Sequence, residues 1–149
     1  MKGAGLTSSL DLAAVDPDSE AGQCDWESIL KQVLPYVDFF VPSIEELAYM
    51  IDRNKYQEWQ ERARGEDIVS ILSLSKDVKP LAEKALSYGC GAVLLKCGAA
   101  GMYLKTSGKE RMKTVDADLE GWDNVELFED SFVPERICPE REPATPVSL

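Results

Sequence analysis

Residues 89–105 read Gly-Cys-Gly-Ala-Val-Leu-Leu-Lys-Cys-Gly-Ala-Ala-Gly-Met-Tyr-Leu-Lys and carry the strongest structural pattern in the chain. The apolar run from Ala92 to Leu95 is too short for a helix and is flanked by glycines. A strand that is buried on both faces of a parallel sheet has this composition. We therefore expect a central strand here, with the rest of the fold arranged around it.

The glycines after this strand predict a tight turn. Gly98 and Gly101 bracket the turn, and Met102 to Leu104 begins a second extended run that can pair antiparallel with the first. The turn follows the carboxyl end of the strand, where open α/β sheets bind ligands, and glycine lets a ligand approach backbone N–H groups closely. A phosphate or nucleotide site is one interpretation. The other is an ordinary hairpin that needs its glycines only for positive φ.

Strand and helix patterns alternate on the amino-terminal side of this segment. Asp25 is a suitable N-cap, Pro80 suits a first helical turn and Gly89 suits a helix end. We expect strands at residues 6–12, 37–41 and 92–95, and helices at 26–34, 44–51 and 78–86. This order predicts an α/β fold with a mostly parallel sheet and a terminal hairpin.

Two acidic residues lie where such a sheet presents its ligand edge. Asp11 ends the first strand and could contact a substrate hydroxyl or a metal, although an aspartate at this position often only opens a loop. Ser43 and Glu46 form a Ser-x-x-Glu capping box, which by itself explains both residues. Glu46 could also hold a divalent cation through water, because this helix begins at the ligand edge.

Composition limits the class of protein. The formal charge of −11 repels phosphate backbones and argues against nucleic-acid binding. The chain has no histidine and no Cys-x-x-Cys pair, which argues against zinc sites and against Ser-His-Asp or Cys-His catalysis. It has no run of 18 apolar residues and no signal-peptide pattern, so we expect a cytoplasmic protein without membrane contact.

The remaining segments define the expected domain limits. Residues 1–132 are expected to form one α/β domain, with residues 53–76 as a helical insertion that exposes Tyr56 and Trp59. Residues 116–130 are acidic with interspersed apolar side chains, which predicts partial packing. Residues 133–149 hold four of the eight prolines and are expected to form a flexible tail.

Three segments in order resemble the second half of a PfkB-type, ribokinase-like carbohydrate kinase. They are Ser-Leu-Asp-Leu at 9–12, Tyr-Val-Asp-Phe-Phe-Val-Pro-Ser-Ile-Glu-Glu-Leu at 36–47, and Gly-Ala-Val-Leu-Leu-Lys-Cys-Gly-Ala-Ala-Gly-Met-Tyr at 91–103. The resemblance covers roughly residues 6–52 and 77–106, and it implies part of a three-layer α/β/α sandwich. It also implies an activity that transfers the γ-phosphate of ATP to a sugar hydroxyl, with ATP and magnesium as cofactors.

The resemblance assigns roles residue by residue. Gly98 and Gly101 match the family's nucleotide-contacting turn, with Lys96 two positions ahead facing the phosphates. Glu46 matches the glutamate of a Pro-Asn-x-x-Glu segment that organises magnesium, while Ser43 stands where asparagine is usual.

One expected part of such a kinase does not occur in this sequence. The family's Gly-Ala-Gly-Asp segment, which supplies the catalytic base and the anion hole, is absent, so no catalytic residue is assigned. The chain therefore resembles a middle piece of a kinase and is expected to be inactive alone, with possible self-association through an open sheet edge. The alternative is a non-catalytic α/β scaffold that acts through protein contacts.

Overall fold

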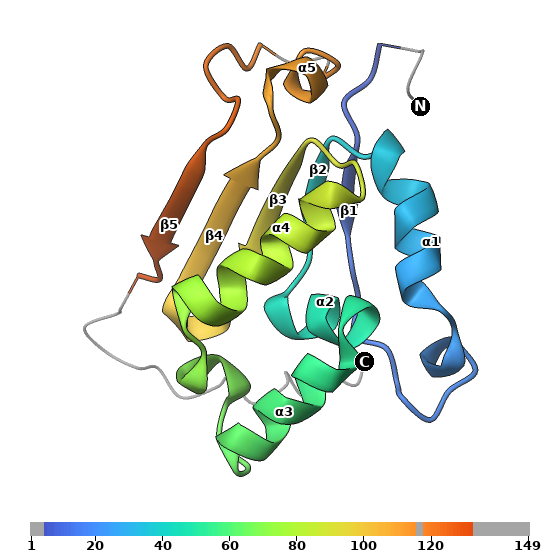
Figure 1. Ribbon diagram of the computed structural model, residues 1–149, viewed down its shortest axis with the longest axis vertical. Coiled ribbons are helices and arrows are strands. Elements are labelled where there is room, and N and C mark those ends of the chain that lie inside the picture. Colours follow the sequence, from blue (N-terminus) through green and yellow to red (C-terminus); the bar gives the residue numbers. More distant parts are fainter. Residues whose placement is uncertain (1–4, 116–117, 133–149) are drawn as a thin grey trace, which may run out of the picture.

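A computed structural model, which describes residues 5–115 and 118–132, contains a five-stranded mixed sheet (Figure 1). The strands lie side by side in chain order: β1 (Ser9–Asp11), β2 (Phe39–Val41), β3 (Ala92–Lys96), β4 (Gly101–Thr106) and β5 (Glu126–Asp130). The first three strands are parallel, and β4 and β5 are antiparallel to their neighbours. The predicted α/β class, the central position of β3 and the β3–β4 hairpin are thus confirmed, but the sheet has as many antiparallel pairings as parallel ones.

Helices connect the parallel strands, and a short helix lies between β4 and β5. Their bounds are α1 (Trp26–Val33), α2 (Ile44–Ile51), α3 (Arg53–Ala63), α4 (Lys79–Ser87) and α5 (Lys109–Met112). Figure 1 shows α4 crossing in front of the sheet and α1 beside β1, whereas α2 and α3 lie beyond the carboxyl ends of the parallel strands. No helix within residues 5–115 and 118–132 is long and apolar enough to cross a membrane.

The main core lies between the sheet and α1 and α4. Strand register places Phe40 beside Val93 and Leu95 beside Tyr103, and all four side chains are fully buried in the same cluster as the apolar faces of these helices. Because side chains alternate along a strand, the neighbouring residues point to the opposite face. One sheet face is therefore the core face, and the other faces away from α1 and α4.

The opposite sheet face carries apolar side chains that are only partly covered. Leu94, Leu104 and Leu127 form one cross-strand row, in which Leu127 is 59% exposed. Met102, two residues before Leu104 on β4 and therefore on the same face, is 39% exposed. This open row, defined as Leu94, Leu104 and Leu127, lies on the side of the sheet where Figure 1 draws no described helix.

Two local predictions need correction. The insertion does contain a helix, α3, but Trp59 is fully buried rather than exposed, because its indole N–H donates to the buried Asp77 carboxylate at 3.1 Å and its ring packs in the core. The acidic 116–130 region was expected to be partly packed, and it contains the strand β5, which the sequence pattern did not predict. The predicted tail at residues 133–149 lies outside the described residues.

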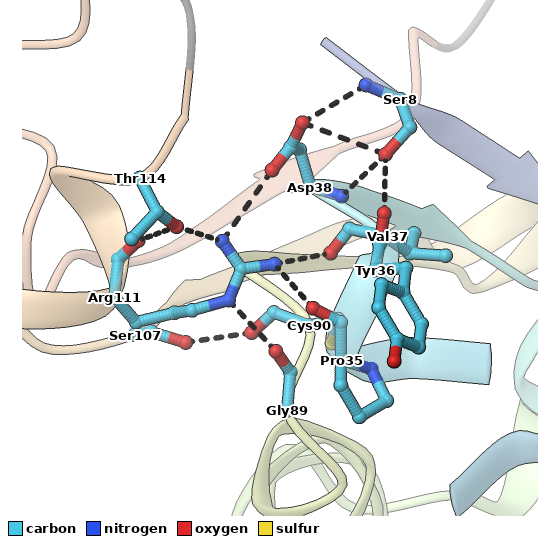
Figure 2. A network of polar contacts seen from close by, with 10 residues as sticks. All are labelled: Ser8, Pro35, Tyr36, Val37, Asp38, Gly89, Cys90, Ser107, Arg111 and Thr114. Carbon is cyan, nitrogen blue, oxygen red and sulfur yellow. Dashed lines mark hydrogen bonds and ion pairs between the residues drawn. The ribbon is translucent and has the colours of Figure 1, made fainter. Parts of the chain in front are cut away.

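A polar network closes the amino-terminal edge of the parallel strands (Figure 2). The Arg111 guanidinium donates to the carbonyls of Gly89 and Val37, each at 2.8 Å, and lies 3.4 Å from the buried Asp38 carboxylate. The same carboxylate accepts the Ser8 backbone N–H at 2.9 Å. Arg111 therefore joins α5 to the segment before β2 and to the turn before β3, at the edge opposite to the one where ligands bind in such sheets.

Candidate functional site

A cavity of about 330 Å³ opens at the carboxyl ends of the parallel strands. It is called the edge cavity here, and its lining residues are Ser43, Ile44, Glu45, Asp67, Val69, Lys96 and Gly98. β3 supplies Lys96, the turn after β3 supplies Gly98, and the start of α2 supplies residues 43–45. Two of the residues predicted to contact a nucleotide, Lys96 and Gly98, are thus brought together at the predicted edge.

Lys96 ends β3 and is held by both backbone and side chain. Its N–H donates to the Pro42 carbonyl at 3.0 Å, and its ammonium donates to the Asp11 carboxylate at 2.8 Å. This hydrogen bond, followed by one from the Leu12 N–H, lowers the pKa of Asp11. The two residues are partly exposed, so Asp11 competes with any anion that approaches Lys96.

The two glycines of the turn have different surroundings. Gly98 has a φ of +52°, and a Cβ there would meet only a Val69 methyl at 3.7 Å. Gly101 has a φ of +127°, and a Cβ there would lie 2.0 Å from the Glu129 carbonyl oxygen of β5. Gly98 therefore leaves open space beside the edge cavity, whereas Gly101 is required for the pairing of β4 with β5 and does not line this cavity.

The capping box at the start of α2 is formed as predicted. The Ser43 hydroxyl accepts the Glu46 N–H at 3.2 Å, and the Glu46 carboxylate accepts the Ser43 N–H at 3.0 Å. Glu46 lines a second cavity rather than the edge cavity, so the structure does not bring Glu46 together with Lys96. The second cavity shares Ser43 and Glu45 with the first.

Glu45 and Asp67 are site residues that the sequence reasoning missed. Burial, together with the nearby carboxylates of Asp67 and Glu46, raises the pKa of Glu45. Glu45 carried a weak signal, since it adjoins the capping box. No sequence signal marked Asp67 as a site residue, because the irregular segment that leads to the 3-10 turn Ile68–Ile71 has no periodic pattern.

The capacity of the site for a metal is limited. Across the described ranges 5–115 and 118–132, no group of three or more His, Cys, Asp or Glu side chains could hold a metal ion. Magnesium is commonly bound by only one or two carboxylates together with substrate phosphates, so Glu45 and Asp67 fit this mode better than a cage made of protein alone.

The buried Cys90 and Cys97 do not add a nucleophile to the site. Burial raises the pKa of the Cys90 thiol to about 12 and that of Cys97 to about 11. Both therefore remain protonated at neutral pH and pack as small apolar side chains.

Comparison with known proteins gives little further guidance. No family model matches the chain, and no curated protein matches it. A solved structure described as "Crystal Structure of Sa239" is similar to it with 17% identity and a TM-score of 0.43, and the match covers 89% of this chain and 31% of that one. The chain thus spans about a third of the length of that protein.

Proposed function

We propose that this chain is the nucleotide-facing segment of an ATP-dependent carbohydrate kinase of the PfkB, ribokinase-like type. The parent enzyme transfers the γ-phosphate of ATP to a sugar hydroxyl, and the chain by itself is inactive. The proposal includes a three-layer α/β/α sandwich in the parent. In that arrangement, further helices cover the sheet face that carries the open row.

One observation carries the proposal. Lys96 and Gly98, which match the family's nucleotide turn, line one cavity at the carboxyl edge of the sheet. Lysine supplies a compact positive charge for phosphate oxygens, and the open space at Gly98 lets a phosphate approach the backbone closely. This is the edge where open α/β sheets bind their ligands.

The acidic side chains of the edge cavity favour a nucleotide that is already bound to magnesium. Glu45 and Asp67 would repel free ATP, whose phosphates carry several negative charges. A magnesium ion on the phosphates converts this repulsion into attraction, because carboxylates hold the ion directly or through water. Glu46 then acts on this ion only indirectly, by fixing the start of α2.

The test is calorimetric titration of the chain with a non-hydrolysable ATP analogue, with and without magnesium. We expect binding in the millimolar range that needs magnesium and weakens about tenfold or more in Lys96→Ala, because a charge-assisted hydrogen bond is lost. Lys113→Ala is the matched control, because it removes the same charge from the residue that follows α5. Figure 1 shows α5 at the end of the sheet opposite to the carboxyl ends of the parallel strands. No binding at millimolar concentration, or equal affinity in Lys96→Ala, would contradict the proposal.

A second candidate function is a non-catalytic α/β scaffold that acts through protein contacts. The open row favours it, because exposed apolar side chains in a contiguous group often mark an interaction surface. Trp59 cannot serve as the contact, since it is fully buried. Sedimentation analysis separates the two functions: a scaffold would show association that Leu127→Lys weakens, together with no magnesium-dependent nucleotide binding.

A further inference from the structure

The second cavity has a different chemical character from the edge cavity. It is called the tyrosine cavity here, its volume is about 210 Å³, and its lining residues are Ala14, Val15, Pro17, Ser43, Glu45, Glu46, Tyr49, Met50 and Tyr56. The loop after β1 forms one wall, and α2 and α3 form the others. The lining combines two aromatic rings, two carboxylates and several apolar side chains.

The two tyrosine rings make a fixed corner. Their centroids are 5.6 Å apart and their planes cross at 84°, an edge-to-face arrangement that rigid aromatic pairs prefer. The Tyr49 hydroxyl donates to the Gly22 carbonyl at 3.2 Å, which anchors this ring to the loop before α1. The corner is therefore set by the fold before any ligand enters.

One of these rings already binds a cation. The Arg53 guanidinium lies 4.6 Å from the centroid of Tyr49 and donates to the same Gly22 carbonyl. A cation over an aromatic face is attracted by the negative potential of the ring. Arg53 covers the Tyr49 ring but is not a lining residue of the cavity. Tyr56 is the other aromatic ring of the cavity, and no cation lies over it among the described contacts.

Within residues 5–115 and 118–132, the lining of the cavity carries carboxylates but no positively charged side chain. No lysine or arginine of the described residues is among its lining residues, which include Glu45 and Glu46. Glu46 accepts the Ser43 N–H, whereas Glu45 has no hydrogen bond or ion pair within the part of the chain that the structure describes. Burial first, and then Asp67 and Glu46, raise the pKa of Glu45, so a cation placed beside it would relieve an unfavourable charge.

We propose that the tyrosine cavity binds a small organic cation, an ammonium group of about the size of choline, between the Tyr56 ring and the Glu45 carboxylate. Weakly hydrated organic cations favour aromatic faces, whereas inorganic cations such as magnesium favour several oxygen ligands. The apolar side chains of Val15 and Met50 contact the alkyl groups of the ligand. This site does not depend on the proposed kinase function.

The test uses choline as the probe and methionine methyl groups as reporters. Met50 lines the tyrosine cavity, whereas Met102 on β4 and Met112 on α5 lie elsewhere. In a chain labelled with ¹³C-methyl methionine, we expect choline to shift the Met50 resonance in a saturable way and to leave Met102 and Met112 unchanged. The neutral isostere 3,3-dimethylbutan-1-ol should bind at least about fivefold more weakly than choline, because it lacks the charge.

Variants make the test specific. Glu45→Gln and Tyr56→Leu should each weaken choline binding about fivefold or more, whereas Glu66→Gln, which removes a charge from an exposed turn, should not. Glu45→Gln and the isostere keep the test decisive even if Tyr56→Leu fails to fold. The proposal is overturned if choline leaves Met50 unchanged, if the isostere binds equally well, or if potassium chloride at equal ionic strength produces the same shift.

Discussion

The Lys96 ammonium lies 2.8 Å from the Asp11 carboxylate, although 85 residues separate them in the chain. β1 and β3 are not neighbours, because β2 lies between them. The contact forms because parallel strands bring their carboxyl ends to one edge of the sheet. It places a carboxylate in direct competition with phosphate for the lysine that the proposed nucleotide site uses.

Asp11→Asn should therefore strengthen the binding of the magnesium-bound ATP analogue. Freeing Lys96 from an exposed ion pair is expected to raise the affinity up to about fivefold. Calorimetric titration measures the change, and Asp18→Asn provides the matched control because it removes an exposed loop carboxylate that does not contact Lys96. Equal gains in the two variants would mean that net charge alone is responsible.

Glu45→Gln should raise the stability of the chain at neutral pH. The pKa of the Glu45 carboxyl group is raised in the folded state, so its negative charge destabilises the fold at pH 7. This destabilisation is lost once the pH falls below 4.5, the pKa of the group in the unfolded chain, because the carboxyl group is then protonated in both states. The dipole of α2 favours a negative charge at this position, whereas burial and the carboxylates of Asp67 and Glu46 oppose it. Urea midpoints between pH 7 and pH 4 should show a gain that disappears at the acidic end, and a gain at both ends would contradict the assignment.

The two turn glycines should respond unequally to alanine. Gly101→Ala is expected to cost at least about 3 kcal/mol in the free energy of unfolding, because its Cβ would overlap the β5 backbone at a strained φ. Gly98→Ala should cost about 1–2 kcal/mol, the penalty of a left-handed conformation without a clash. Chemical denaturation measures both, and equal costs would show that β5 does not pair as described.

The Arg111 network should be one of the main supports of the fold. Arg111→Met is expected to cost about 3 kcal/mol, because it removes a guanidinium that lies 3.4 Å from the fully buried Asp38 carboxylate and donates hydrogen bonds of 2.8 Å to the Gly89 and Val37 carbonyls. The double variant with Asp38→Asn should cost less than the sum of the two single variants, which urea denaturation in a double-mutant cycle measures. Lys113→Met is the control, since its partner Glu110 is 93% exposed and the change should stay within about 0.5 kcal/mol. Additive costs in the cycle would argue against a direct interaction.

The purified chain should transfer no phosphate from ATP to common sugars. Its sequence has no Gly-Ala-Gly-Asp segment, which would supply the catalytic base and the anion hole in the proposed kinase. Loss of the base alone costs about 10²–10⁴-fold in rate, and loss of an anion-hole donor costs about 10²–10³-fold more. A coupled assay for ADP release across a panel of sugars tests this, and turnover that Lys96→Ala abolishes would contradict it.

Features that depend on near neighbours in the chain were predictable from the sequence. The capping box of Ser43 and Glu46, the N-cap Asp25, the helix end at Gly89 and the apolar strand from Ala92 all appear as expected. The caps and the helix end rest on hydrogen bonds or backbone conformations that span a few residues, so the local sequence contains their whole cause. The strand from Ala92 was predictable from its apolar run, although its hydrogen bonds come from β2 and β4. The position of Lys96 and Gly98 at the carboxyl edge follows from the same strand and turn.

Only the tertiary structure decided which distant side chains meet. Trp59 looked like a surface residue of an amphipathic helix, yet Asp77 and the core bury it. β5 has no clear strand pattern in Glu-Leu-Phe-Glu-Asp and exists through its pairing with β4. The contact between Lys96 and Asp11, the unbalanced charge of Glu45 and the tyrosine corner beside it likewise arise from elements that the fold brings together. Local propensity cannot encode such contacts, because their energy comes from partners whose positions depend on the whole topology.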